Sequence, residues 1–132
     1  MTEIVNYKTI TVTGYMGNNE NSFTSDINLD FQPDEVVVKL IIFDNAINVI
    51  TDRIYIIKTD LIDNNILAPL EAATGFIQPI NIPYKINKSI NGQYTFSIWN
   101  YDGSEPDDIA DFEVALGITL TFIKYKTPFY LR

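Results

Sequence analysis

Apolar and polar residues alternate at every second position through most of the chain, which predicts β-strands rather than helices. Residues 4–13 place Ile10 and Val12 on one face of a strand and Thr9 and Thr11 on the other. Ile, Val, Thr, Tyr and Phe are abundant in such segments, and these residues fit a pleated, half-buried surface. The pattern predicts strands over residues 4–13, 26–32, 36–43, 46–51, 53–58, 80–90, 93–101 and 114–125.

Turn residues divide these segments. Asn91-Gly92 lies between two alternating runs and predicts a type I′ hairpin that joins residues 80–90 to residues 93–101. Asp44-Asn45 predicts a second tight turn. Pro83 lacks an N–H, so its strand is expected at a sheet edge or a bulge.

Two segments need a separate interpretation. Residues 36–43 form an almost continuous apolar run, which predicts a central strand covered on both faces. Residues 59–79 are ambiguous because Pro69 followed by Glu71 fits a single helical turn, and a plain loop fits equally well.

The spacing of turn signals, roughly ten residues, is typical of an all-β sandwich or barrel. A chain of 132 residues fits one domain over residues 1–132. We therefore predict an antiparallel two-sheet β-sandwich, jelly-roll-like, with about eight or nine strands.

Composition excludes several chemistries. The chain contains no cysteine and no histidine, so disulfides, thiolate metal sites and a Ser-His-Asp triad are excluded. Among 17 acidic residues some pair of carboxylates will lie close together, but the sequence favours none as catalytic. We expect a non-enzymatic protein without catalytic, metal or cofactor-binding residues and without a cofactor.

The charge limits the partners. Nine basic against 17 acidic residues give a net charge of −8 and no basic stripe, so nucleic acid is not an expected partner. Residues 1–6 lack the pattern of a signal peptide, and the longest apolar run, 36–43, is too short to span a bilayer. We expect no membrane association and synthesis in the cytoplasm.

An acidic loop is a first candidate site. It gathers six carboxylates within twelve residues: Asp102, Glu105, Asp107, Asp108, Asp111 and Glu113. Oxygen ligands at this density could hold Ca²⁺, although the spacing differs from that of an EF-hand. A solvated surface loop is the alternative.

Trp99 and Tyr101 are a second candidate, two residues apart and next to the acidic loop. Aromatic rings stack on sugars, and the carboxylates of Asp102, Glu105 and Asp107 could accept hydrogen bonds from sugar hydroxyls. Trp99 in the core or at a subunit interface is the alternative interpretation. Strand parity places Trp99 on a partly polar face, which favours an exposed or interface position.

The last residues suggest contact between copies. Pro128, Phe129, Tyr130 and Leu131 form an apolar run that either packs on its own sheet or reaches a neighbouring subunit. Threonines on two strands could form ladders on a sheet face that bears on assembly, or could be ordinary solvent-facing positions; they are Thr9, Thr11, Thr13, Thr119 and Thr121.

Residues 27–39, INLDFQPDEVVVK, resemble the F-x-P-D-x-V-x-V-K stretches of β-rich structural proteins of virophages, related large DNA viruses and phage tail modules. The Ile- and Asn-rich composition is also typical of the AT-rich genomes of that group. The resemblance covers thirteen residues and implies a virion component with a jelly-roll or similar sandwich, forming symmetric oligomers with other virion proteins as partners. It identifies no catalytic or binding residue.

The expected function is therefore that of a non-enzymatic viral structural protein, such as a minor capsid or spike component, that assembles as a homo-oligomer in the virion. The alternative is a carbohydrate-binding, lectin-like module with a glycan as its ligand.

Overall fold

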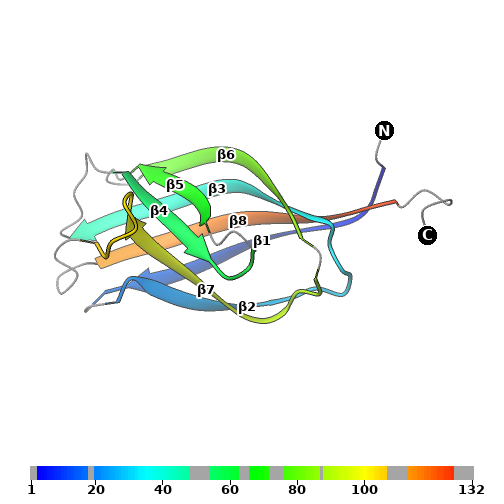
Figure 1. Cartoon of the computed structure of the whole chain (residues 1–132), viewed down its shortest axis with the longest axis horizontal. Coiled ribbons are helices and arrows are strands. Elements are labelled where there is room, and N and C mark those ends of the chain that lie inside the picture. Colours follow the sequence, from blue (N-terminus) through cyan, green and yellow to red (C-terminus); the bar gives the residue numbers. More distant parts are fainter. Residues whose placement is uncertain are drawn as a thin grey trace.

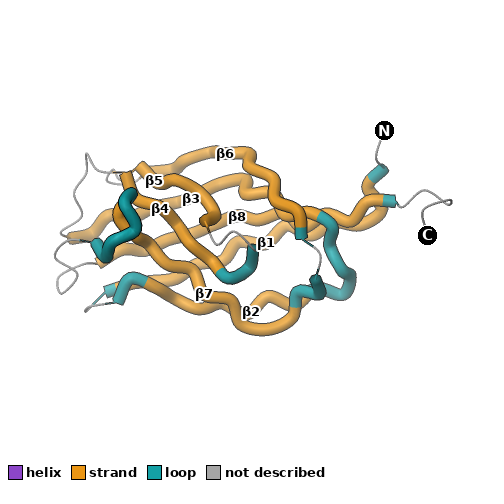
Figure 2. Tube along the Cα trace, in the orientation of Figure 1, coloured by secondary structure: helices purple, strands orange, loops and turns teal. Residues whose placement is uncertain are grey.

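The computed structural model describes residues 3–17, 20–47, 54–62, 66–71, 76–86, 88–106 and 113–126. These residues form two antiparallel sheets that face each other, and no helix occurs among them (Figures 1 and 2). The strands are β1 (Ile4–Met16), β2 (Ser22–Asn28), β3 (Glu35–Ile47), β4 (Ile54–Thr59), β5 (Ile66–Glu71), β6 (Phe76–Lys85), β7 (Asn91–Asn100) and β8 (Glu113–Tyr125).

The strand order identifies the architecture. One sheet has the order β1-β8-β3-β6 and the other the order β2-β7-β4-β5. The strands β4 and β7 run obliquely across β8 and β3 (Figure 1). Most consecutive strands, such as β1 and β2 or β7 and β8, lie in different sheets, so the chain crosses repeatedly from one sheet to the other. Eight strands in two four-stranded sheets connected in this way form a jelly roll. The predicted all-β, two-sheet, jelly-roll-like sandwich is confirmed.

The core fills the space between the sheets. Val38, Leu120 and Phe122 from the first sheet and Phe96 and Ile98 from the second are fully buried. These side chains occupy alternate positions on their strands, so every second residue points inward. The alternation seen in the sequence therefore corresponds to the inner and outer faces of the sheets.

Gly14 permits a close contact between β1 and β2. A Cβ atom added at Gly14 would lie 2.1 Å from Cγ of Phe23, far inside van der Waals contact. The Phe23 ring in turn stacks on Phe96 with 5.5 Å between ring centroids. The missing side chain of Gly14 thus makes room for an aromatic pair of the opposite sheet.

The predicted hairpin at Asn91-Gly92 is wrong. These residues are the first two of β7, and Gly92 lies opposite Ile27 of β2 with a φ of 136°. Ile86 and Ile90 are buried on the path that carries the chain from one sheet to the other. Burial of these two side chains outweighs the local turn preference, and glycine accommodates the positive φ at the beginning of a strand.

The predicted turn at Asp44-Asn45 is also wrong. The strand β3 continues to Ile47, and Asp44 lies opposite Ala115 of β8. The 13-residue partner strand β8 keeps β3 extended where the local sequence favours a turn. Pro69 likewise belongs to β5 rather than to a helical turn or a loop, while residues 72–75 lie outside the described residues.

The strand β6 is at the edge of its sheet, as Pro83 predicts. The strand β3 is an interior strand, but its two faces are not both covered. Its side chains Lys39 and Ile42 are exposed on the outer face, with Ile42 exposed to 40%. The apolar run of β3 therefore continues onto the surface of the molecule.

Candidate functional site

The outer face of the β1-β8-β3-β6 sheet combines threonines, small residues and exposed apolar side chains. We call it the threonine face. It consists of the outward positions of four adjacent strands, namely Thr9, Thr11, Thr13 and Tyr15 of β1, Ala115, Gly117, Thr119 and Thr121 of β8, Val37, Lys39, Leu40 and Ile42 of β3, and Ile77, Pro79, Asn81 and Pro83 of β6.

Threonine hydroxyls on this face bond to each other between strands. The Oγ1 atoms of Thr9 and Thr121 are 2.9 Å apart, and those of Thr11 and Thr119 are also 2.9 Å apart. The expected cross-strand contacts between threonines are therefore present. Each of these four hydroxyls already has a protein partner. They would therefore keep a hydrogen bond if another surface covered this face and excluded water.

Large apolar side chains are exposed beside the threonines. Tyr15 is exposed to 58%, Ile42 to 40% and Ile77 to 61%, and Tyr7 at the end of the face to 67%. These are four of the eight large hydrophobic side chains that are exposed among the described residues. A concentration of this kind on one face is typical of an interaction surface.

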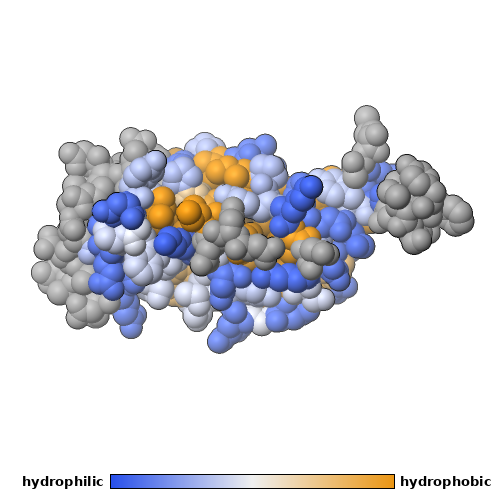
Figure 3. Space-filling model, in the orientation of Figure 1, coloured by the Kyte–Doolittle hydropathy of each residue, from blue (hydrophilic) through white to orange (hydrophobic). Residues whose placement is uncertain are grey.

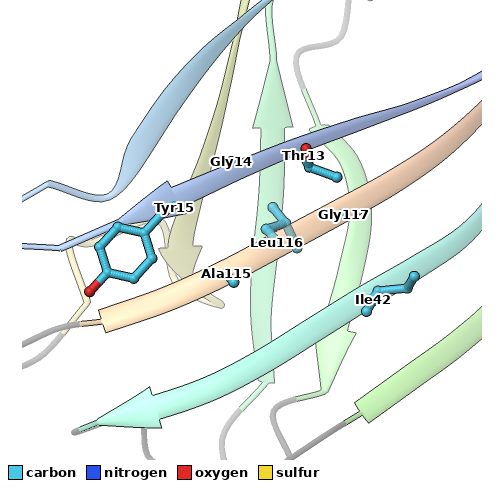
Figure 4. A pocket seen from close by; sticks show the side chains of 7 residues that line it. All are labelled: Thr13, Gly14, Tyr15, Ile42, Ala115, Leu116 and Gly117. Atoms are coloured by element: carbon cyan, nitrogen blue, oxygen red, sulfur yellow. The ribbon is translucent and has the colours of Figure 1, made fainter.

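A groove crosses the threonine face near the end of β1. It has a volume of about 420 Å³, and Figure 4 shows Tyr15 and Ile42 on either side of Ala115 and Gly117. Small residues leave this space open between larger side chains. Its lining consists of Thr13, Gly14, Tyr15, Ile42, Ala115, Leu116 and Gly117.

Charged residues lie at one end of the threonine face and, as Lys39, at one place within it. Glu35 and Lys85 are opposite each other at one end. Lys39 lies at the β-bulge of β3, where its Nζ donates a hydrogen bond of 3.2 Å to Oδ1 of Asn81. The strip formed by β1 and β8 between Thr9 and Tyr15 carries no charged side chain at its outward, described positions. Interface centres are depleted of charge in this way.

The strands β1 and β8 extend together beyond the other strands (Figure 1). The backbone N–H of Lys126 donates to the carbonyl of Glu3 over 2.6 Å, and their side chains form an ion pair at 3.7 Å. Ile4 and Val5 on this two-stranded ribbon are about half exposed, at 50% and 53%. The ribbon therefore adds apolar surface next to the threonine face.

Trp99 lies on the other sheet, on the outer side of β7. Its Nε1 donates a hydrogen bond of 2.7 Å to Oγ of Ser97, and Nζ of Lys58 lies 5.2 Å from its ring centroid. The neighbouring surface over β2 and β7 is hydrophilic (Figure 3). A notch of about 260 Å³ opens here, lined by Lys58, Thr59, Asp60, Thr95, Ser97 and Trp99.

Of the other residues predicted around Trp99, Tyr101, Asp102 and Glu105 follow β7 and do not line this notch. Tyr101 is exposed to 72%. Asp102 accepts hydrogen bonds from the N–H and the hydroxyl of Ser104, at 3.0 and 2.6 Å. The buried Asn100 closes the turn by donating 2.8 Å to the carbonyl of Glu105.

Several predicted residues fall outside the described part of the chain. They include Asp107, Asp108 and Asp111 of the acidic loop, and also Pro128, Phe129, Tyr130 and Leu131. Within the described part, no three acidic side chains lie close enough together to hold a metal ion. None of its elements is a helix that could span a membrane.

Sequence reasoning missed the partners of Trp99 that the fold supplies. Lys58 and Asp60 are about forty residues away in sequence and reach Trp99 because β4 pairs with β7, with Ile56 opposite Trp99. Long-range pairing of this kind leaves no local signal. Parity alone indicated the outward position of Trp99, on the same face as Ser97.

Comparison with known proteins gives likenesses in fold alone. No family model matches the chain, and no curated protein matches it. The Drosophila NLP-core, described in connection with pentamer formation and histone binding, aligns over 83% of this chain and 96% of its own, with 13% identity and a TM-score of 0.42. A pilus protein of Bacillus endospore appendages aligns over 93% and 90%, with 10% identity and a TM-score of 0.41.

A protein from the structure of infectious bursal disease virus, Gx strain, aligns over 96% of this chain but 34% of its own, with 12% identity and a TM-score of 0.45. This chain therefore spans about a third of that viral protein. The expected resemblance to viral β-rich proteins is found in weak form, at the level of the fold.

Proposed function

We propose that this protein is a non-enzymatic structural component of a virus particle that assembles with copies of itself through the threonine face. The observation that carries the proposal is the exposure of Tyr15, Ile42 and Ile77 on one sheet face whose β1–β8 strip carries no charge. In a chain with 20% charged residues, such a surface is suited to burial.

A second copy is a suitable partner for this face. Four strands about 4.8 Å apart and about nine residues long cover roughly 600 Å². The β1–β8 ribbon adds to this area, so a two-fold pairing of two such faces approaches the roughly 800 Å² per partner of a stable interface. In a two-fold dimer the same surface patch of each copy meets its counterpart, so the patch must be complementary to itself. Uncharged threonine and apolar side chains meet this requirement because they do not repel their own kind.

The virion assignment is supported by the resemblance of residues 27–39 to viral structural proteins. In the structure this segment begins at Ile27 in β2 and ends at Lys39 in β3, so it includes the crossover between the two sheets. Mass spectrometry of purified particles tests this part of the proposal. Detection at a fixed ratio to the major proteins supports it, and absence from clean particles contradicts it.

Sedimentation velocity over about 1 to 200 µM tests the assembly, since this range covers micromolar dissociation constants. We expect the wild type to sediment as an oligomer and Thr119→Lys to sediment as a monomer, because a lysine would be buried without a partner. Thr24→Lys is the matched control, since Thr24 is exposed on the outer side of β2 in the other sheet. A wild type that stays monomeric throughout contradicts the proposal.

A glycan-binding role is the second candidate function. The observation that favours it is the outward position of Trp99 beside Lys58 and Ser97.

A further inference from the structure

The notch at Trp99 combines the groups that recognise a sugar acid. Its indole is held in one orientation by the 2.7 Å hydrogen bond to Ser97. An oriented aromatic ring offers a flat apolar platform for the C–H face of a sugar ring. The notch volume of about 260 Å³ is sufficient for one monosaccharide and too small for most larger organic ligands.

Lys58 provides the positive charge of the notch. Its ammonium lies 5.2 Å from the centroid of Trp99, and no ion pair joins it to a carboxylate of the described residues. An ammonium group without a carboxylate partner among the described residues is suited to an anionic ligand.

Asp60, two residues after Lys58, is held in the notch by two contacts. Its Oδ1 accepts a hydrogen bond of 2.9 Å from the N–H of Thr95, and its carbonyl accepts one of 3.2 Å from Nζ of Lys88. The ammonium of Lys88 also lies 6.0 Å from the ring centroid of Tyr94. Lys88 does not line the notch, so Lys58 and Asp60 are its two charged side chains, and Asp60 can accept hydrogen bonds from ligand hydroxyls.

We propose that this notch binds a pyranose ring that carries a carboxylate. The ammonium of Lys58, which lies over the Trp99 ring, moves aside to pair with the carboxylate. The pyranose ring stacks on the indole, and ring hydroxyls donate to Asp60. This site is distinct from the threonine face, because Trp99 and Lys58 lie on the outer side of the opposite sheet.

The test compares two probes that differ in one group. Methyl β-D-glucuronide has a carboxylate where methyl β-D-glucoside has a hydroxymethyl group. We follow the indole N–H signal of Trp99 by NMR while each probe is titrated into the folded protein, and expect dissociation constants in the range of about 1 to 10 mM. The glucuronide should bind about two- to fivefold more tightly, as one partly exposed ion pair allows.

Variants assign the contacts. Lys58→Gln should make the two probes bind equally. Trp99→Ala removes the indole signal, so this variant is followed through the backbone amide signals of Thr95 and Ser97, which line the notch, and it should bind neither probe. Tyr101→Ala is the matched control, since Tyr101 is an exposed aromatic residue two positions away that does not line the notch. It should bind like the wild type.

Two results would overturn the proposal. One is an indole signal of Trp99 that does not move with either probe, and the other is equal binding of both probes to the wild type. The proposed assembly is measured separately, by sedimentation, so either proposal can fail while the other stands.

Discussion

Gly14 is a position where one methyl group should have a measurable cost. In Gly14→Ala the new Cβ would lie 2.1 Å from Cγ of Phe23, so the ring must move away from its stacking partner Phe96. Overpacking of this kind costs about 1 to 3 kcal/mol of the free energy of unfolding. Urea unfolding followed by circular dichroism measures the loss.

Gly117→Ala is the matched control for this prediction. It too is a glycine within a strand, but its added Cβ would lie 3.6 Å from Cβ of Ile42, an ordinary contact. We expect this variant to be as stable as the wild type or slightly more stable, because alanine restricts the unfolded chain. Equal destabilisation by both substitutions would show that the contact with Phe23 is not the cause.

Tyr84 joins the two sheets by one hydrogen bond. Its hydroxyl, on β6, donates to the carbonyl of Leu67 on β5. Burial raises the pKa of Tyr84 above its usual value of 10.0. The folded form therefore holds this proton at higher pH than the unfolded form, so the stabilisation is complete below pH 10 and is lost as the pH rises through the folded pKa.

Tyr84→Phe should lower the free energy of unfolding by about 1 kcal/mol at neutral pH, because the Leu67 carbonyl loses its partner. The variant should also lose less stability than the wild type above pH 10. Tyr125→Phe is the comparison, since the hydrogen bond to Glu35 is the main cause that raises the pKa of Tyr125. Thermal unfolding of both variants is measured from neutral to alkaline pH. If the loss of stability above pH 10 were the same in Tyr84→Phe as in the wild type, this account would be contradicted.

Residue-level function was only partly predictable from the sequence. The outward position of Trp99 follows from alternation along one strand, which is local information. Its neighbours Lys58 and Asp60 come from β4 and the turn after it, and only strand pairing brings them near. Gly14 gives no sequence signal either, because Phe23 approaches it from the opposite sheet.

At the scale of elements, the edge strand β6 carries its own protection against unwanted pairing. Pro79 lies opposite Leu40 of β3, and Pro83 lies opposite Val37. In an edge strand a proline is tolerated where its missing N–H would face solvent rather than the neighbouring strand. Without these donors a passing strand cannot pair fully with the edge. Pro83→Val restores a donor and should increase aggregation, measured by light scattering during incubation at elevated temperature.

Asn81→Thr serves as the control for the edge, since it raises the β-propensity of the same strand and leaves both prolines in place. It should aggregate less than Pro83→Val. If both variants aggregate equally, the added β-propensity rather than the N–H group would be responsible.

Elements were predictable where one face of a strand is buried, and less so at their ends. The alternation in β7 and β8 predicted both strands to within two residues at each end. The end of β3 was missed because Asp44-Asn45 favours a turn locally, whereas pairing with Ala115 and Val114 of β8 extends the strand. The Asn91-Gly92 hairpin was wrong for the same reason, since burial of Ile86 and Ile90 decides the path there.

At the scale of the whole molecule, alternation and turn spacing predicted a sandwich, but the strand order comes from long-range packing. The last strand β8 lies between β1 and β3, which no local pattern encodes. This order places the threonines of β1 beside those of β8 and thereby creates the threonine face. The face that we propose for assembly is therefore a product of topology.

The net charge of −8 on each copy opposes assembly, and this gives the proposed interface a salt dependence of known sign. Copies that meet through an uncharged strip gain little from ion pairs, while their overall charges repel each other. Raising the ionic strength from about 0.01 M to about 0.1 M shortens the Debye length from about 30 Å to about 10 Å and weakens this repulsion. We expect the association constant from sedimentation equilibrium to rise several-fold over this range, and Thr119→Lys to remain monomeric at both salt concentrations. An interface held by ion pairs would respond in the opposite direction, so association that weakens with salt would contradict assembly through the threonine face.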